Sequence, residues 1–236
     1  MALPPQDTAQ FEREVDEEYR RQQAADFSKK YGLWIGLAVA AFLAAVGGWL
    51  FWQDRQEKTA EANAEELAGI IADLTEENPN REELEPRLEA LAEQSDGGAA
   101  AAARMIEASY VLSDGDRAQA IEIYQAVAGD DDVPEAYQGA ALLRWTYLDF
   151  DTADPDAIIA RLQPLASPGN PYFGSAAELT ALALIKLDRE REAAELFKAI
   201  AEDPEAPRTL RARAVQIAGT YGVDASAALA DIEAQE

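Results

Sequence analysis

The side chains that carry most enzymatic and metal chemistry are missing from this chain or lack the required spacing. None of its 236 residues is Cys or His, which excludes thiolate nucleophiles, Cys-ligated zinc and His-dependent triads. Paired carboxylates could act as acid and base. However, the run Asp130 to Asp132 lacks the glycine and distal glutamate of a calcium loop, and Asp114 with Asp116 also departs from that pattern. We interpret both as turn and capping residues, and expect no enzyme activity, no cofactor and no metal site.

The charge balance argues against nucleic acid as a partner. The chain has 20 Lys and Arg against 45 Asp and Glu, a formal net charge of −25. Nucleic-acid binders need a basic footprint for the phosphate backbone, so none is expected here. Hydrophobic residues make up 48% of the sequence, too many for a disordered acidic tail. We therefore expect a folded, acidic binding module.

Aromatic residues and arginine, which dominate protein-interface hot spots, gather in one part of the chain. The expected helix at 134–150 and the start of the next one carry six candidate partner-binding residues, namely Tyr137, Arg144, Trp145, Tyr147, Tyr172 and Phe173. Their alternative role is core packing, and we expect at least half of them to be core residues. The exposed remainder is predicted to contact a chaperone or an emerging polypeptide.

An apolar segment predicts how the chain is anchored. Residues 31–52 carry no charge, and as a helix of about 33 Å they could cross a hydrocarbon core of roughly 30 Å. Aromatic residues at both ends are typical of membrane interfaces. A buried core helix and a cleaved signal peptide are the alternatives, but the segment is long for either and begins after 30 residues. Within it, a ridge of small residues recurs every fourth position and could approach a partner helix: Gly36, Ala40, Ala44 and Gly48.

Basic residues near the segment predict its orientation. Five Lys or Arg lie in the 18 residues before it, and only Arg55 and Lys58 lie in the 18 after it. Because basic residues stay in the cytoplasm, residues 1–30 are predicted to be a cytoplasmic tail, and residues 53–236 are predicted to lie on the opposite side of the membrane.

A five-residue pattern recurs along residues 53–236. It consists of a large apolar residue, any residue, Ala or Pro, an aliphatic residue and Ala, and it begins at Leu88, Tyr124, Leu162 and Phe197. The spacings of 36, 38 and 35 residues are typical of helix–turn–helix repeats such as the tetratricopeptide repeat. The prediction is therefore all-α: a single N-terminal transmembrane helix followed by a tetratricopeptide-like solenoid of about four helix pairs. A generic Ala-rich helical bundle is the alternative.

Helix start and stop signals give the expected boundaries. Asn80, Asp116, Asp154 and Asn170 are predicted N-caps, and Gly115 a stop between paired helices. The expected helices are 57–76, 81–94, 99–113, 116–128, 134–150, 155–166, 171–187, 189–202, 207–221 and 224–234. The first could continue the membrane helix, since no helix breaker lies between Gln53 and Ala68. Solenoids of this kind offer a concave face lined mainly by the first helix of each pair.

The order of these segments resembles the YfgM family, the ancillary subunits of the bacterial SecYEG translocon. The likeness is carried by KKYGLWIGLAVAAFLAAVGGW and by repeats such as DRAQAIEIYQAVA and DREREAAELFKAI. It implies a Gram-negative inner membrane, a periplasmic repeat domain, and partners that include SecYEG, a membrane-anchored periplasmic chaperone and emerging polypeptides. No catalytic residue carries over. The repeats lack the Trp-x-x-Leu-Gly-x-x-Tyr opening of regular tetratricopeptide repeats.

Two functional interpretations follow. In the first, the protein is a membrane-anchored adaptor of the Sec translocon that passes secreted polypeptides to periplasmic chaperones. In the second, it is a cell-envelope scaffold or assembly factor unrelated to secretion. A third interpretation, a repeat adaptor facing the cytoplasm, requires the opposite topology.

Overall fold

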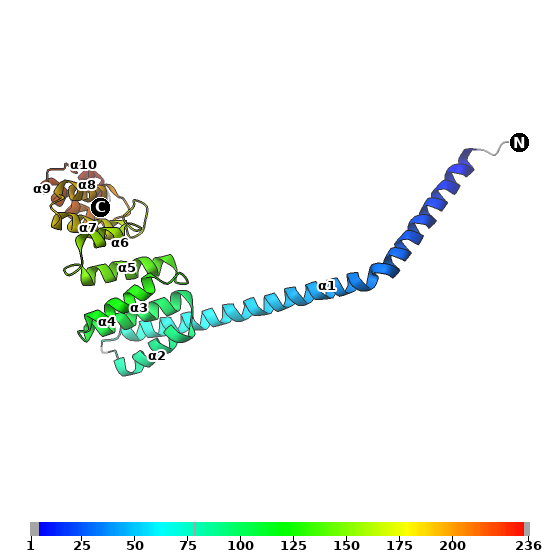
Figure 1. Cartoon of the computed structure of the whole chain (residues 1–236), viewed down its shortest axis with the longest axis horizontal. Helices are drawn as coiled ribbons and strands as arrows, with labels where there is room; N and C mark the ends of the chain where they lie inside the picture. The colour runs from blue at the N-terminus through cyan, green and yellow to red at the C-terminus, as the bar shows by residue number, and fades with distance from the viewer. Residues whose placement is uncertain (1–4, 78, 234–236) are drawn as a thin grey trace. The chain divides into compact units, whose positions relative to one another are not determined.

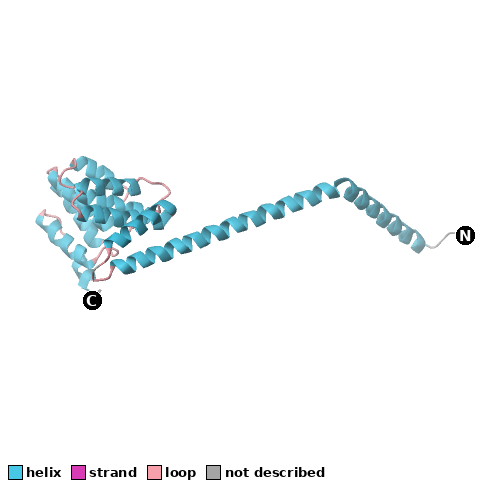
Figure 2. Cartoon of the chain, turned by 90° about the horizontal axis from the view of Figure 1, so that it is seen from below, coloured by secondary structure: helices cyan, strands magenta, loops and turns pink. Residues whose placement is uncertain are grey.

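The computed structural model describes the backbone of residues 5–77 and 79–233, and the side chains of residues 31–230 except 32, 35 and 78. Within these ranges all regular structure is helical, as Figure 2 shows, which confirms the all-α prediction. The helices labelled in Figure 1 are α1 (Pro5–Leu74), α2 (Arg81–Gln94), α3 (Gly97–Ser113), α4 (Arg117–Ala128), α5 (Glu135–Asp149), α6 (Pro155–Leu162), α7 (Phe173–Lys186), α8 (Glu190–Glu202), α9 (Arg208–Thr220) and α10 (Ala227–Glu233).

The chain divides into two units, Met1–Glu61 and Ala62–Glu236. In the first, the apolar segment lies within α1 and its large side chains are exposed, Leu33 at 76% and Trp34 at 70%. Among the residues that were described, α1 alone contains a stretch long and apolar enough to cross a membrane, and none of that stretch is buried. A core helix would be mostly buried, so that alternative is wrong, and the segment is a candidate membrane span.

Helix α1 runs from Pro5 to Leu74 without interruption. The apolar helix therefore continues into the first helix of the repeats, as the absence of a helix breaker between Gln53 and Ala68 had suggested. Residues 1–30, the predicted cytoplasmic tail, lie outside the range whose side chains the structure describes, so the tail stays a prediction. The ridge from Gly36 to Gly48 is exposed, and a Cβ atom added at either glycine would meet no neighbour within 4 Å; helix packing along the ridge stays a prediction.

The second unit is a series of helix pairs that share their cores. Buried residues form four clusters, each made by three or four successive helices, from the end of α1 to α10. The four residues that open the repeated pattern lie one in each cluster: Leu88, Tyr124, Leu162 and Phe197, all 3% exposed or less. The small residues expected between neighbouring helices, such as Ala108 and Ala193, are fully buried. The repeat register is therefore confirmed.

Two of the four predicted N-caps form, and Asn170 is not the N-cap of α7, which is Tyr172. Asp116 accepts a hydrogen bond from the Gln119 amide at 3.0 Å and Asp154 from the Asp156 amide at 2.9 Å. Gly115 has a φ of 90°, a left-handed conformation that glycine adopts without steric cost. Asn80 was predicted wrongly, because its side chain caps no backbone amide; its amide group instead donates to the Glu83 carboxylate at 3.3 Å.

The largest boundary difference is at α6, which ends at Leu162 rather than at residue 166. Pro164 explains the difference, because proline lacks the backbone N–H that would continue the helix and its ring clashes with the carbonyl four residues earlier. Helix α7 likewise begins at Phe173 rather than at Pro171. There, Asn170 accepts from the Tyr172 amide at 2.8 Å and closes a turn before the helix.

Successive first helices contact each other through glycines. A Cβ atom at Gly98 would lie 3.3 Å from the Tyr137 ring, and one at Gly174 would lie 2.9 Å from Leu210. The same relation joins α5 to α7, where a Cβ at Gly139 would lie 2.6 Å from the Tyr172 ring. Each first helix thus leaves space near its start for a large side chain of the next repeat, which holds the first helices side by side.

Candidate functional site

The six predicted partner-binding residues divide into a buried or packed group and an exposed group. Phe173 is 1% exposed and lies in the core cluster of α7–α10, so it cannot contact a partner and leaves the candidate set. Trp145 is half-buried between helices. Its indole N–H donates to Asp149 at 3.0 Å, and the Arg161 guanidinium lies 3.7 Å from its ring centroid. Trp145 therefore joins α5 to α6.

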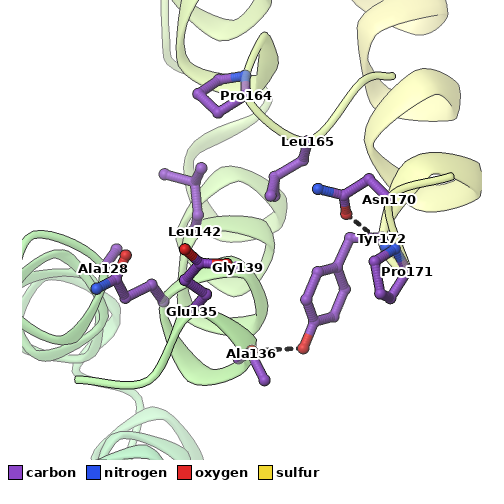
Figure 3. Close-up of a pocket in the computed structure, with 11 residues that line it drawn as sticks. Ala128, Glu135, Ala136, Gly139, Leu142, Pro164, Leu165, Asn170, Pro171 and Tyr172 are labelled. Atoms are coloured by element: carbon purple, nitrogen blue, oxygen red, sulfur yellow. Dashed lines mark hydrogen bonds between the residues drawn. The ribbon is translucent and has the colours of Figure 1, made fainter. Parts of the chain in front are cut away.

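Tyr137 and Tyr172 also have structural contacts. Tyr137 packs on the core cluster of α3–α5 and faces Gly98. The Tyr172 ring covers Gly139, and its hydroxyl donates to the backbone carbonyl of Ala136 (Figure 3). Both side chains retain partial exposure. Their main role is to connect one repeat to the next.

Arg144 and Tyr147 remain exposed, and they belong to a group that spans three helices. Tyr147 on α5 is 49% exposed. The groups near enough to influence its hydroxyl are Ser175 and Glu178 of α7, Arg144 of α5 and Arg213 of α9. Arg213 forms an ion pair with Glu178. We call this group the first-helix surface and define it by Arg144, Tyr147, Ser175, Glu178 and Arg213.

The repeat period explains why these residues meet. Ser109, Arg144, Glu178 and Arg213 lie 35, 34 and 35 residues apart, so they occupy equivalent positions on α3, α5, α7 and α9. Tyr147 and the 38%-exposed Leu182 are likewise 35 residues apart. The sequence-based prediction missed Glu178 and Arg213 because it looked for aromatic clusters. Projecting Arg144 forward by one and two periods would have found both.

The electrostatics of the surface suit a mixed polar and apolar contact. The pKa of Tyr147 is raised, first by partial burial and then by the Glu178 carboxylate, while Ser175 and the two arginines oppose the shift. The tyrosine therefore stays neutral and presents a ring with a polar edge. Arg144 forms no ion pair with any residue that the structure describes, so its guanidinium is available for a carboxylate or carbonyl of a partner.

No group of three or more Asp and Glu side chains is placed to hold a metal ion among the residues searched. The structure therefore assigns no metal ligands within the described range. Within this turn the Asp130 carboxylate is occupied in another way: it pairs with Arg104 at 3.4 Å and accepts from the Asp132 amide at 3.0 Å. This agrees with their interpretation as turn residues.

A family model described as a tetratricopeptide repeat-like domain matches residues 25–218. The chain belongs to this family. The match includes the apolar segment as well as the repeats up to Ala218 in α9. Tetratricopeptide repeat-like domains typically bind other proteins and are not typically enzymes, which indicates a protein-binding role for the repeat domain in general terms. Searches of curated proteins and of solved structures gave no match.

Proposed function

We propose that the protein is a membrane-anchored adaptor that binds its protein partners on the first-helix surface. The observation that carries this proposal is the exposed Tyr147 ring beside Arg144, Glu178 and Arg213, on three helices that the repeat period holds together. An exposed aromatic residue next to a free guanidinium is a combination typical of interface hot spots. The family's general role in protein binding supports the adaptor function.

The proposed location is the inner membrane of a bacterium, with the N-terminus in the cytoplasm and the repeats in the periplasm. The supporting observation is the excess of basic residues before the apolar segment, five against two. Lys29 and Lys30 stand directly at its boundary. The lack of cysteine suits an oxidising compartment, where no thiol can mispair.

Within this setting we propose the role of an ancillary Sec translocon subunit that links secreted polypeptides to a membrane-anchored chaperone. The likeness to the YfgM family supports this, because the same order of tail, apolar helix and acidic repeats is found here. The family match, from residue 25 to residue 218, also covers both the apolar helix and the repeats.

Affinity purification from membranes in mild detergent tests the proposal. The full chain should co-purify with translocon subunits and a membrane-anchored chaperone, and the double variant R144E/Y147A should lose them. The matched control is Arg117→Glu, the same charge change at an exposed arginine of α4, outside the first-helix surface. Co-purification of outer-membrane assembly or cell-division factors instead would overturn the Sec role and favour an envelope scaffold.

The membrane anchor has its own test. Leu43→Arg places a charge in the middle of the apolar segment, which costs about 2.5–3.5 kcal/mol of insertion free energy. We expect this variant to be partly extracted from membranes by alkaline carbonate, whereas Leu43→Phe stays bound. A periplasm-active reporter fused after Glu236 should be active. An inactive reporter would reverse the proposed orientation.

A further inference from the structure

Among the four helix pairs from the end of α1 to α8, one differs, because its second helix α6 is short. The second helices α2, α4 and α8 have 14, 12 and 13 residues, but α6 has only 8. Instead of another turn of helix, residues 163–172 form an irregular connection that contains Pro164, Pro168 and Pro171. This connection lies opposite the first turns of α5.

The result is an open pocket of about 640 Å³ at this position (Figure 3). Its walls come from the end of α4, the first turns of α5 and the connection before α7. Among the lining residues, Leu142, Leu165, Pro164, Pro171 and the Tyr172 ring are apolar. Glu135 is two and a half helical turns from Arg144 and so lies on the opposite side of α5, whereas the lining residue Ala136 lies on the same side as Tyr147 but about three turns away from it along the helix.

The walls are fixed before any ligand arrives. Tyr172 is held at three points: its ring by Gly139, its hydroxyl by the Ala136 carbonyl and its amide by Asn170. The prolines restrict the backbone of the connection. A pocket that is already ordered loses little conformational entropy on binding, which favours a specific ligand. Its volume is also within the range of about 300–1,000 Å³ found for ligand sites.

The rim of the pocket is acidic. Glu135 is exposed and lines the pocket. The loop that joins the lining residues Ala128 and Glu135 carries Asp131 and Asp132, which are exposed and form no ion pair with the residues described. None of the lining residues is Lys or Arg. The apolar interior thus has one carboxylate in its lining, that of Glu135, and two more in the loop that leads to it.

We propose that this pocket is a second protein-binding site, for a polypeptide segment with large apolar side chains next to Lys or Arg. The apolar side chains fill the space between Leu142, Leu165 and Tyr172, and the basic residue pairs with Glu135 and the neighbouring aspartates. The inference goes beyond the adaptor function proposed above, because it uses different residues of α5 and a defined partner chemistry. It makes the domain bivalent, with the pocket at the first turns of α5 and the first-helix surface towards its end.

Fluorescence anisotropy with short labelled peptides tests the site, using the full chain in phosphatidylcholine nanodiscs and empty nanodiscs as the blank. The probes are a peptide of alternating leucine and lysine, the same peptide with glutamate in place of lysine, and one with serine in place of leucine. We expect the leucine–lysine peptide to bind best. Glu135→Lys should weaken it about tenfold and strengthen the leucine–glutamate peptide.

Ala136→Trp should block the pocket for every peptide. Ala136 is exposed and contributes only its backbone carbonyl to the Tyr172 bond, so a larger side chain can be accommodated there. An unchanged thermal midpoint verifies that this variant folds; if it unfolds, the charge reversal at Glu135 decides alone. The variant R144E/Y147A should leave peptide binding unchanged even where it abolishes co-purification of partners. Equal binding of both charged peptides, or loss of binding only in R144E/Y147A, would overturn the second site.

Discussion

The ring of Tyr172 lies against the backbone of Gly139, so closely that a Cβ atom at position 139 would be 2.6 Å and 2.7 Å from two of its carbons. The Tyr172 hydroxyl then reaches the Ala136 carbonyl one turn earlier in α5. One tyrosine thus fixes the distance between two successive first helices. It also forms a wall of the pocket at the end of α6.

We therefore predict that Gly139→Ala destabilises the repeat domain. The added methyl group forces the Tyr172 ring out of its position, and such overpacking typically costs about 1–3 kcal/mol. Urea denaturation followed by circular dichroism measures the change. The matched control is Gly219→Ala in α9, where a Cβ would have no neighbour within 4 Å; it should be neutral or stabilising, by up to about 1 kcal/mol. Equal effects at both positions would contradict the close contact.

A second prediction concerns the core. Phe197 is 1% exposed and occupies the repeated large-apolar position in the cluster of α7–α10. Phe197→Ala should lower the free energy of unfolding by about 3–5 kcal/mol, because it removes apolar burial and leaves a cavity. The neighbouring Lys198→Ala removes only an exposed ion pair and should change stability by less than about 1 kcal/mol. An unchanged thermal midpoint for Phe197→Ala would show that the register is wrong.

A third prediction addresses the link between α5 and α6. Asp149 accepts hydrogen bonds from Arg161 at 2.8 Å and from the Trp145 indole at 3.0 Å, and the ion pair is largely shielded, with side chains 17% and 13% exposed. Asp149→Ala leaves the guanidinium without its partner, so we expect a loss of about 2–3 kcal/mol, below the range for a fully buried pair.

The control for this link is Asp151→Ala. Asp151 also faces a basic residue, Lys186 at 3.5 Å, but its side chain is 91% exposed. Its removal should have almost no effect on denaturant stability, because surface ion pairs contribute at most about 1 kcal/mol. Similar losses for the two aspartates would show that shielding does not distinguish them.

A fourth prediction is a pH dependence at Glu107 of α3. Partial burial, and secondarily the nearby Glu89 carboxylate, raise its pKa above 4.5, while Arg104 opposes the shift. Arg81, Glu85 and Asp114 line the same groove between α2 and α3. Since the folded-state pKa is the higher one, the protonated form is favoured by folding. The stabilisation is present below the ordinary glutamate pKa and is lost as the pH rises through the raised value.

Glu107→Gln, which is neutral at every pH, should accordingly raise the thermal midpoint at pH 7. The gain should disappear near pH 4, where Glu107 of the wild-type protein is itself protonated. Thermal scans of both proteins across this pH range measure the difference. The exposed Glu122→Gln on α4 removes the same charge from the whole molecule, and a comparable gain there would mean that net charge, and not the position of Glu107, is responsible.

Much of the architecture could be predicted because it depends on local and periodic features. The uncharged segment at 31–52 can be recognised as a candidate membrane span from the sequence alone. The register of the pairs followed from four residues at a nearly constant spacing, since a buried position must be apolar in every repeat. Asp116 and Asp154 were recognisable as caps because a cap bonds to amides only two or three residues away.

The candidate binding residues could be predicted only in part. An aromatic or arginine side chain serves equally well in a core, in an interhelical contact or on an exposed surface, and its type does not distinguish these. Phe173 is in the core, Trp145 is fixed by Arg161 and Asp149, and Tyr147 is exposed. The position of each side chain depended on contacts with neighbouring helices, whose residues are between 12 and more than 30 positions away in the sequence.

The sequence by itself thus determined the composition-based exclusions, the apolar helix and the period of the repeats, because each depends on residue type and short-range spacing. Only the tertiary structure brought Glu178 and Arg213 to Tyr147. It also showed that α6 ends at Leu162 and that the connection after it lines an open pocket, which the next helix does not fill. Both results depend on how separate helices pack, and packing is a property of side-chain shapes that meet across the repeats.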